Sequence, residues 1–261
     1  MLNSKIQWYD ENNFPEIVAD SPENGFSIII IPATSTVHIK YAKEAPKYEN
    51  LFYKQIIGWI SGVLLEELDK KSPKVMNGQT GEMSDQKAIV LHATLPDQKI
   101  ASIGIINIFK QGSGDTITFE GSGFEVKSCF INGQKFNFAD YLIQNKTDLK
   151  LPLVANYQGA MVNVSFQRID EENQIVYLYA PVFKDTEYKL AASVGNYVES
   201  FKSKLPSDLT DPNFSCNCIL NYLYSELEGK KTGNIVGPIT FGEIAFQLLN
   251  QTLVYLTIQN R

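Results

Sequence analysis

Short apolar runs, separated by turn residues, predict that strands dominate this chain. Residues 26–31 are rich in isoleucine and end at Pro32, which favours a buried strand. Residues 36–41 alternate between polar and apolar side chains and predict a second strand or an extended continuation of the first. Further strands are expected at residues 88–95, 100–109, 115–120, 124–131, 160–168, 174–182 and 253–258.

Helical spacing of apolar residues occurs at three places. In residues 51–68 the apolar positions recur at helical spacing, and Lys70 and Lys71 suit the negative end of a helix. Residues 190–205 and 218–227 are expected to form two more helices, the second of which ends at Gly229. Residues 1–25 contain two prolines and few regularly spaced apolar residues, which predicts an irregular arm.

A turn motif occurs twice and predicts an internal repeat. Each copy follows an expected helix, contains a threonine and a glycine-glutamate pair, and leads into an expected strand. Thr80 and Glu82 belong to the first copy, and Thr240 and Glu243 belong to the second. We therefore expect an α+β fold of two similar sheet-and-helix halves with mixed, mostly antiparallel sheets. The halves are expected at residues 26–123 and 124–261, after the arm at residues 1–25.

Composition narrows the class of protein. The 261 residues carry a formal net charge of -6 and are 44% hydrophobic, which is typical of a globular protein with a buried core. Positive charge is not in excess, so nucleic acid is not an expected partner. No apolar stretch reaches the roughly 20 residues that span a membrane, and no signal peptide is recognisable. Three cysteines do not make a secreted disulfide scaffold, so we expect a cytoplasmic protein.

Several segments together resemble a known family. They are Glu125-Val126, the turn at Asn132-Gly133 with a short helix at residues 138–142, the Pro-Leu segment at residues 151–154, the strand at 175–182 followed by Leu190-Ala191, the Ser-Cys turn at 215–218 and the Gly-Glu turn at 237–243. In order and spacing they resemble the C-terminal half of the FIST (F-box and intracellular signal transduction) sensory domain family. The resemblance covers roughly residues 75–261. It implies cytoplasmic sensing of a small ligand, with amino acids as the ligand class and a signalling protein as a candidate partner.

The Cys216-Asn217-Cys218 segment stands just before an expected helix that contains Asn221. Unpaired backbone N–H groups and the positive helix end can lower a thiol pKa or bind a carboxylate at such a place. Cysteine also packs as a small apolar side chain in protein cores, and this alternative stays open. Zinc is not expected, because C-x-C differs from the usual C-x-x-C spacing and no second close pair exists.

The two turn glutamates suggest a site for an ammonium group. If the halves face each other, Glu82 and Glu243, with Thr80 and Thr240, can grip the ammonium group while backbone donors hold the carboxylate. Alternatively, a glutamate after a glycine caps backbone N–H groups or faces solvent. Either reading leaves Cys216, Asn217, Cys218 and Asn221 as the carboxylate side of the candidate site.

The chain contains two histidines, His38 and His92, and no recognisable catalytic triad. This scarcity of bases favours non-enzymatic binding of a small polar metabolite, without cofactor, metal, nucleic acid or membrane. Two alternatives remain. One is a cysteine-dependent or other hydrolase, for which His92 is the histidine on a well-formed expected strand. The other is a structural or interaction protein whose pocket has decayed.

Overall fold

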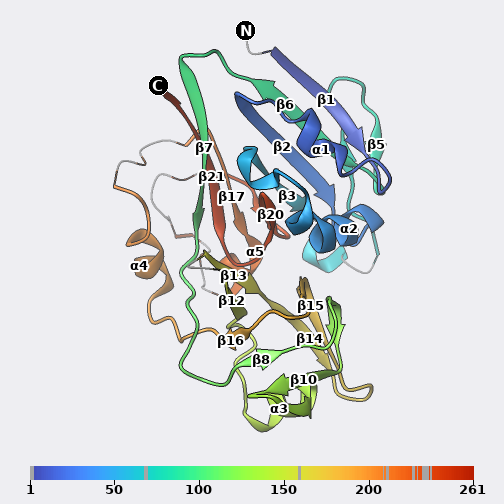
Figure 1. The fold of residues 1–261 in the computed structure, drawn as a ribbon, viewed down its shortest axis with the longest axis vertical. Coiled ribbons are helices and arrows are strands. Elements are labelled where there is room, and N and C mark those ends of the chain that lie inside the picture. Colours follow the sequence, from blue (N-terminus) through green and yellow to red (C-terminus); the bar gives the residue numbers. More distant parts are fainter. Residues whose placement is uncertain are drawn as a thin grey trace. The chain divides into compact units, whose positions relative to one another are not determined.

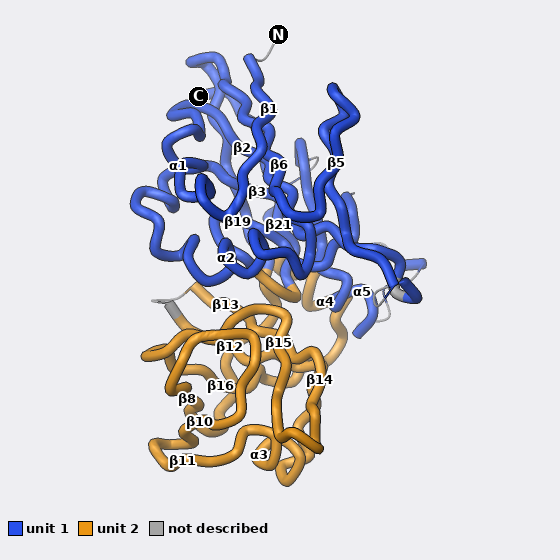
Figure 2. The backbone as a smooth tube through the Cα atoms, turned by 90° about the vertical axis from the view of Figure 1, so that its right-hand side faces the viewer, with its two compact units in different colours: residues 1–106, 205–248, 252–261 blue, residues 107–204, 249–251 orange. Residues whose placement is uncertain are grey.

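The computed structural model has an α+β fold with mixed and antiparallel sheets, as the sequence predicts (Figure 1). It describes residues 3–67, 70–157, 160–207, 209, 212–224, 227, 229–230, 235 and 237–261. The chain forms two compact units (Figure 2). Unit 1 comprises residues 1–106, 205–248 and 252–261, and unit 2 comprises residues 107–204 and 249–251.

Two large sheets form most of unit 1. The six-stranded sheet has the order β1-β6-β2-β3-β19-β20, with β2 and β3 parallel and the pairs β1–β6, β2–β6 and β3–β19 antiparallel. The four-stranded sheet has the order β18-β17-β21-β7, with β17 and β18 parallel. The strands are β1 (Asn3–Tyr9), β2 (Gly25–Pro32), β3 (Ile56–Ser61), β6 (Ala88–Thr94), β7 (Lys99–Ile106), β17 (Phe214–Cys218), β18 (Ile239–Thr240), β19 (Glu243–Ala245), β20 (Gln247–Leu249) and β21 (Leu253–Asn260).

The two faces of the six-stranded sheet have different coverings. Trp59 of β3 stacks on Phe214 of β17, so the face that carries Trp59 packs against the four-stranded sheet. Register places Ser27 and Ile29 of β2 on the opposite face, which we call the outer face. Helices α1 (Glu16–Asp20) and α2 (Thr36–Glu44) cover the outer face, where Phe14 contacts the rings of Tyr9 and Tyr41.

Unit 2 is built around a separate aromatic core. Its six-stranded sheet has the order β11-β10-β8-β16-β12-β13, and its three-stranded sheet has the order β14-β15-β9. Phe119 contacts the rings of Phe138 and Tyr188, and Phe138 contacts Phe166. The elements are β8 (Ile117–Thr118), β9 (Gly123–Val126), β10 (Ser128–Ile131), β11 (Gln134–Asn137), α3 (Phe138–Gln144), β12 (Leu153–Tyr157), β13 (Ala160–Val164), β14 (Phe166–Asp170), β15 (Ile175–Val182), β16 (Tyr188–Leu190) and α4 (Tyr197–Lys202).

Two of the expected elements have the wrong type. The helix expected at residues 51–68 is not formed: residues 51–67 contain two 3-10 turns, η2 (Leu51–Tyr53) and η3 (Leu65–Glu67), and between them β3, while residue 68 lies outside the described residues. Because β3 lies between β2 and β19 and is buried on both faces, nearly all its residues are apolar, and this imitates helical spacing. Residues 36–41 were expected to be a strand, but they begin α2. The Ser35 hydroxyl accepts from the backbone N–H of His38, which is an N-cap that outweighs the weak alternation.

Other expected boundaries also change. The irregular arm expected at residues 1–25 is not found in the described residues 3–25, because β1 pairs with β6 along seven residues and α1 follows. Of residues 190–205, only α4 is helical, since Asn196 caps it and β16 ends at Leu190. The helix expected at 218–227 is α5 (Ile219–Tyr224). Residues 225, 226 and 228 lie outside the described residues.

The two copies of the turn motif have different surroundings. In the first, β4 (Val75–Met76) pairs with β5 (Met83–Ser84) in a two-stranded hairpin. In the second, β18 pairs with β17 and β19 pairs with β3, while Val236 lies outside the described residues. The repeat in sequence is therefore not a repeat in strand pairing. The compact units also differ from the expected halves at 26–123 and 124–261, because the last strands complete the sheets that the first strands begin.

Candidate functional site

Four of the eight residues predicted to form a site, Cys216, Cys218, Thr240 and Glu243, gather between the two sheets of unit 1, and Asn221, which bonds to Asn217, connects to Glu243 through Thr252. Register places Glu243 opposite Trp59, which turns its side chain toward the four-stranded sheet. There, Oε1 lies 3.1 Å from the hydroxyl of Thr240. Oε2 accepts from the hydroxyl of Thr252 at 2.9 Å and from its backbone N–H at 3.2 Å. Glu243 is fully buried, with 0% of its surface exposed.

The other members come from β17 and α5. Cys216 and Cys218 are two residues apart on one strand and share the face that meets the six-stranded sheet. The Cys216 thiol donates to the carbonyl of Gly58 at 3.3 Å. Asn221 donates from Nδ2 to Oδ1 of Asn217 at 2.9 Å and to the carbonyl of Thr252 at 3.2 Å. The side chains of Cys216, Asn217, Cys218 and Asn221 are all buried. This agrees with the alternative interpretation of the sequence, in which the cysteines pack in the protein core.

Burial dominates the electrostatics of this cluster. It raises the pKa of Glu243 to about 8, although hydrogen bonds from Thr252, Thr240 and Cys218 act in the opposite direction. The fold therefore favours the protonated form of Glu243, whose Oε1 and Oε2 lie within hydrogen-bond distance of the Thr240 and Thr252 hydroxyls. Burial and the nearby Glu243 raise the pKa of the Cys216 thiol well above its usual value. The cluster is a set of neutral, hydrogen-bonded core groups, and contact of Glu243 with a ligand stays a prediction.

Thr80 and Glu82 do not join this cluster. They lie in the turn between β4 and β5, where the hydroxyl of Thr80 accepts from the backbone N–H of Glu82 at 3.3 Å and both side chains are exposed. This matches the alternative interpretation of the sequence, in which the glutamate after a glycine faces solvent in a turn.

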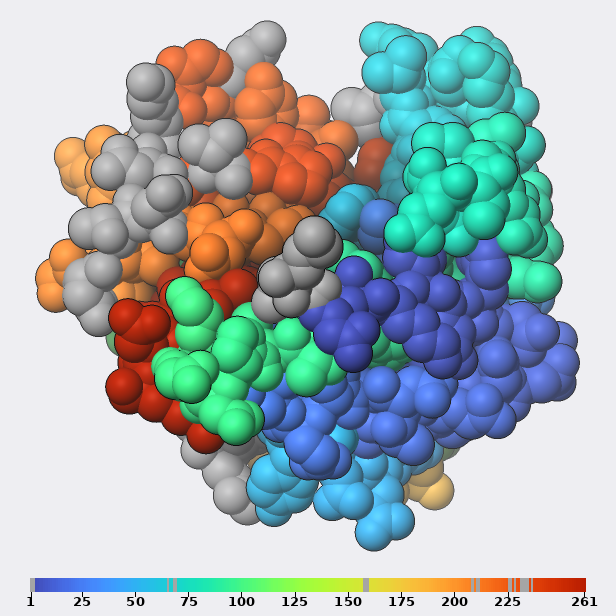
Figure 3. Space-filling view, turned by 90° about the horizontal axis from the view of Figure 1, so that it is seen from above, coloured from blue at the N-terminus to red at the C-terminus, as the bar shows by residue number. Residues whose placement is uncertain are grey.

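Figure 3 shows a hollow in the surface of unit 1, with cyan to teal residues on one side and orange residues on the other.

A depression in unit 2 offers an accessible site that the sequence did not predict. It has a volume of about 660 Å³ and is open to solvent. Its lining comes from β8, the residues after it, β10 and the connection from β15 to β16, namely Thr118, Phe119, Glu120, Phe130, Lys184, Asp185 and Glu187. Small-molecule sites have volumes of about 300–1,000 Å³, so the depression has a suitable size.

Charges of both signs surround the half-buried ring of Phe130. Glu120 accepts from Lys135 Nζ at 2.8 Å and from the Ser128 hydroxyl at 3.1 Å, and these bonds lower the pKa of its carboxyl. Across the depression, the backbone N–H of Lys184 donates to the hydroxyl of Ser122 at 2.9 Å. The next residue, Asp185, has a φ of 62° in the left-handed region. The only signal in the sequence was a charged turn between two strands, which carries no motif.

His92 lies apart from the cysteines. Its ring nitrogens lie 2.8 Å from the Ser27 hydroxyl and 2.8 Å from the Tyr9 hydroxyl, on the outer face of the six-stranded sheet. Cys216 lies on the other side of that sheet. The structure therefore does not bring together the base and the thiol that a cysteine-dependent hydrolase requires.

Within the part of the chain that the structure describes, no group of three or more His, Cys, Asp and Glu side chains is placed to hold a metal ion. No helix formed by the described residues is both long and apolar enough to cross a membrane.

Comparison with known proteins identifies a family but no characterised relative. No curated protein and no solved structure matches the chain. One family model matches residues 1–259, which is nearly the full length. The chain therefore belongs to DUF6976, a family of unknown function.

Proposed function

We propose that this protein binds a small polar metabolite that carries an ammonium group, such as an amino acid, in the depression of unit 2, without catalysing a reaction. The observation that carries the proposal is the lining of that depression. Lys184 and the carboxylates of Asp185 and Glu187 stand at its rim, and Phe130 contributes an aromatic surface.

The charges of the lining suit a ligand with groups of both signs. Lys135 already pairs with Glu120, so the carboxylates of Asp185 and Glu187 supply the attraction for an ammonium group. Lys184 offers a cation to a ligand carboxylate, and the face of the Phe130 ring also attracts cations. A free amino acid carries both charges at a short separation. The lining of the depression therefore suits an amino acid better than it suits a singly charged anion.

The titratable groups of unit 1 favour binding over catalysis. A nucleophile acts only where a substrate can reach it. Cys216 is 1% exposed and Ser27 is 0% exposed, and both make hydrogen bonds inside the fold. The rival function, a hydrolase, requires one of these groups to open to solvent.

Cellular context belongs to the same proposal. Cys129, Cys216 and Cys218 form no disulfide in the structure, which suits the reducing conditions of the cytoplasm. We place the protein there, as a sensor whose ligand-bound state a signalling protein reads. The resemblance to the FIST family supports the amino-acid class and this partner.

The experiment is a calorimetric binding screen of amino acids, primary amines and carboxylic acids. At least one amino acid should bind, and Glu187→Gln and Lys184→Met should each weaken it at least fivefold. Glu172→Gln, an exposed substitution in the β14–β15 turn, is the matched control and should leave the affinity unchanged. No binding at millimolar ligand, or binding that ignores both rim substitutions, contradicts the proposal. Hydrolysis of an ester or amide probe that depends on Cys216 would favour the rival.

A further inference from the structure

The floor of the depression in unit 2 is one face of its six-stranded sheet. Strands β16, β8, β10 and β11 are consecutive neighbours in that sheet (Figure 2). Thr118 of β8 is opposite Phe130 of β10, and Phe130 is opposite Lys135 of β11. Side chains directly opposite each other share a face, so these three residues form a row across the floor.

The same row continues to the connection between β15 and β16. Tyr188 of β16 is opposite Ile117 of β8, and both residues are 1% exposed, so they face the aromatic core of unit 2. Side chains alternate along a strand, which turns Glu187 to the other face, beside Thr118. Both Glu187 and Thr118 line the depression. Glu187 therefore stands at the floor, in line with the ring of Phe130.

Hydrogen bonds hold the backbone of this connection at two places. The Tyr188 hydroxyl accepts from the backbone N–H of Phe183 at 2.9 Å. The backbone N–H of Lys184 donates to the Ser122 hydroxyl at 2.9 Å. Asp185 follows with a φ of 62°, in the left-handed region that aspartate and asparagine enter more readily than most residues. The charges of Lys184 and Asp185 are therefore presented from a backbone that the fold holds in place.

The charges of the depression are unequal in number. Glu120 and Lys135 form an ion pair, in which both carboxylate oxygens lie 2.8 Å from Nζ, and as a pair they are neutral. Among the described residues, Lys184, Asp185 and Glu187 make no ion pair with the protein. The connection therefore offers two carboxylates and one ammonium group to a ligand.

The three classes of amino acid fit this set of charges differently. A neutral amino acid has one ammonium and one carboxylate, so it leaves one carboxylate of the depression without a partner. An acidic amino acid brings two carboxylates to the single cation of Lys184. A basic amino acid has two cations and one carboxylate, which match Asp185, Glu187 and Lys184 one to one. The stem of its side chain can also pack on the ring of Phe130, whose face attracts cations.

We propose that the depression selects amino acids with a cationic side chain, and that Asp185 is the carboxylate that pairs with that side chain. The inference rests on the proposed function of the same site. Lys184 takes the ligand carboxylate, and Glu187, at the floor, takes the ammonium group that all amino acids share. Asp185 then decides between ligands, because it has a partner only when the side chain is cationic.

Calorimetry with arginine and citrulline tests this selectivity. Citrulline has nearly the shape of arginine but carries a neutral urea group in place of the guanidinium. The wild type should bind arginine about fivefold more tightly than citrulline at low salt, which is the upper range for an exposed ion pair. Because Asp185 is exposed, this ratio should approach one at about 0.5 M salt, where charges are screened within a few ångströms.

Substitution of Asp185 separates selectivity from binding. Asp185→Asn keeps the size of the side chain and tolerates the left-handed backbone, so it should bring the ratio close to one by weakening arginine alone. Unchanged affinity for citrulline shows that the variant is folded. Glu187→Gln should weaken both ligands alike, since both carry the shared ammonium group. Glu172→Gln, in the exposed β14–β15 turn, is the matched control and should keep the wild-type ratio.

The outcomes distinguish this inference from the proposed function. Equal affinities for arginine and citrulline, or a ratio that Asp185→Asn does not change, would overturn the selectivity and leave amino-acid binding intact. Tighter binding of glutamate than of arginine would overturn it in the same way. If no amino acid binds, the proposed function itself is wrong, and the selectivity is wrong with it.

Discussion

Glu243 and His92 lie on opposite faces of the same six-stranded sheet. His92 is opposite Ser27, Ser27 is opposite Ile56, and Glu243 is opposite Trp59, three residues further along β3. An odd separation on a strand reverses the face. Burial raises the pKa of Glu243 and lowers the pKa of His92, so burial favours the neutral form of each group, and the two respond to pH in opposite directions.

Replacing Glu243 with glutamine should remove one source of the pH dependence of the protein's stability. Its pKa is about 8 in the fold and 4.5 ordinarily, so the folded state binds this proton more tightly. Its contribution to stability is complete below pH 4.5 and decreases as the pH rises through 8. Between pH 6 and pH 8.5, the melting temperature of Glu243→Gln should fall less than that of the wild type. Glu82→Gln, at an exposed turn, should follow the wild type, and parallel curves for all three proteins would contradict the buried carboxylic acid.

Alanine at Gly58 should destabilise unit 1 strongly. A Cβ at this position would lie 1.8 Å from the carbonyl oxygen of Ile29, a backbone atom of the parallel partner strand. Separating the strands should cost about 2 kcal/mol or more, measured by urea unfolding. A Cβ at Gly114 meets nothing within 4 Å, so Gly114→Ala should change stability by less than about 0.5 kcal/mol. Equal effects at the two glycines would show that β2 and β3 do not pair as described.

Alanine at Asn163 should destabilise unit 2. Asn163 is fully buried, exchanges hydrogen bonds of 2.9 and 3.1 Å with Asn107, and donates to the carbonyl of Asn250 at 3.0 Å. Its removal leaves buried polar groups without a partner, at a cost of about 3 kcal/mol. Asn12→Ala, in the exposed turn after β1, should be nearly neutral. A similarly small loss for Asn163→Ala in chemical denaturation would refute this network.

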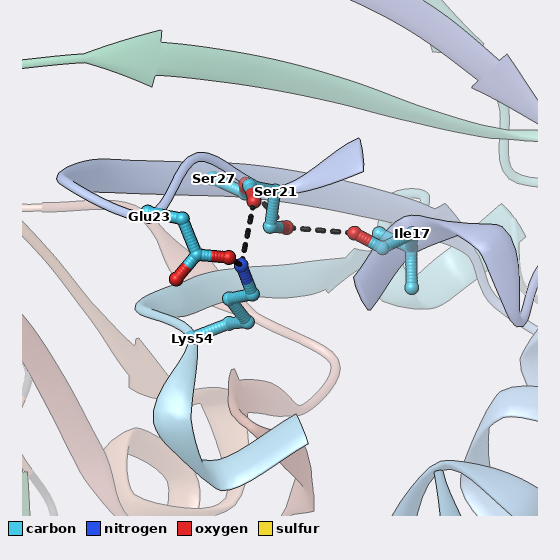
Figure 4. Close-up of polar contacts among 5 residues, drawn as sticks. All are labelled: Ile17, Ser21, Glu23, Ser27 and Lys54. Atoms are coloured by element: carbon cyan, nitrogen blue, oxygen red, sulfur yellow. Dashed lines mark hydrogen bonds and ion pairs between the residues drawn. The ribbon is translucent and has the colours of Figure 1, made fainter. Parts of the chain in front are cut away.

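The two residues of the ion pair between Lys54 and Glu23 (Figure 4) should contribute unequally to the stability of the fold. The Lys54 side chain is 9% exposed and also bonds Ser21, whereas the Glu23 side chain is 93% exposed. Lys54→Met keeps the apolar stem but should lose about 1 kcal/mol, because the Ser21 carbonyl loses a charged donor. Glu23→Gln should change stability by less than about 0.5 kcal/mol, since exposed ion pairs contribute little. Equal losses in thermal unfolding would mean that the ion pair itself stabilises the fold.

Local signals in the sequence were sufficient where local chemistry decides the structure. The strand at β2, the helix α3 and the Asn132-Gly133 turn were all expected, and both turn residues have positive φ, as a tight hairpin requires. The grouping of Cys216, Thr240 and Glu243 was also expected from their positions in the chain. The type of β3 was not, because burial on both faces removes the alternation that marks a strand.

Tertiary structure alone decided which polar groups face solvent and which face each other. Nothing adjacent in sequence indicates that Tyr9, Ser27 and His92 meet, since three strands must pair in register before their side chains share a face. The same holds for Glu243, whose chemistry depends on a second sheet that excludes water from it. The sequence determined the residue types and the class of fold. Long-range strand pairing determined their burial, and burial sets both their pKa values and their access to a ligand.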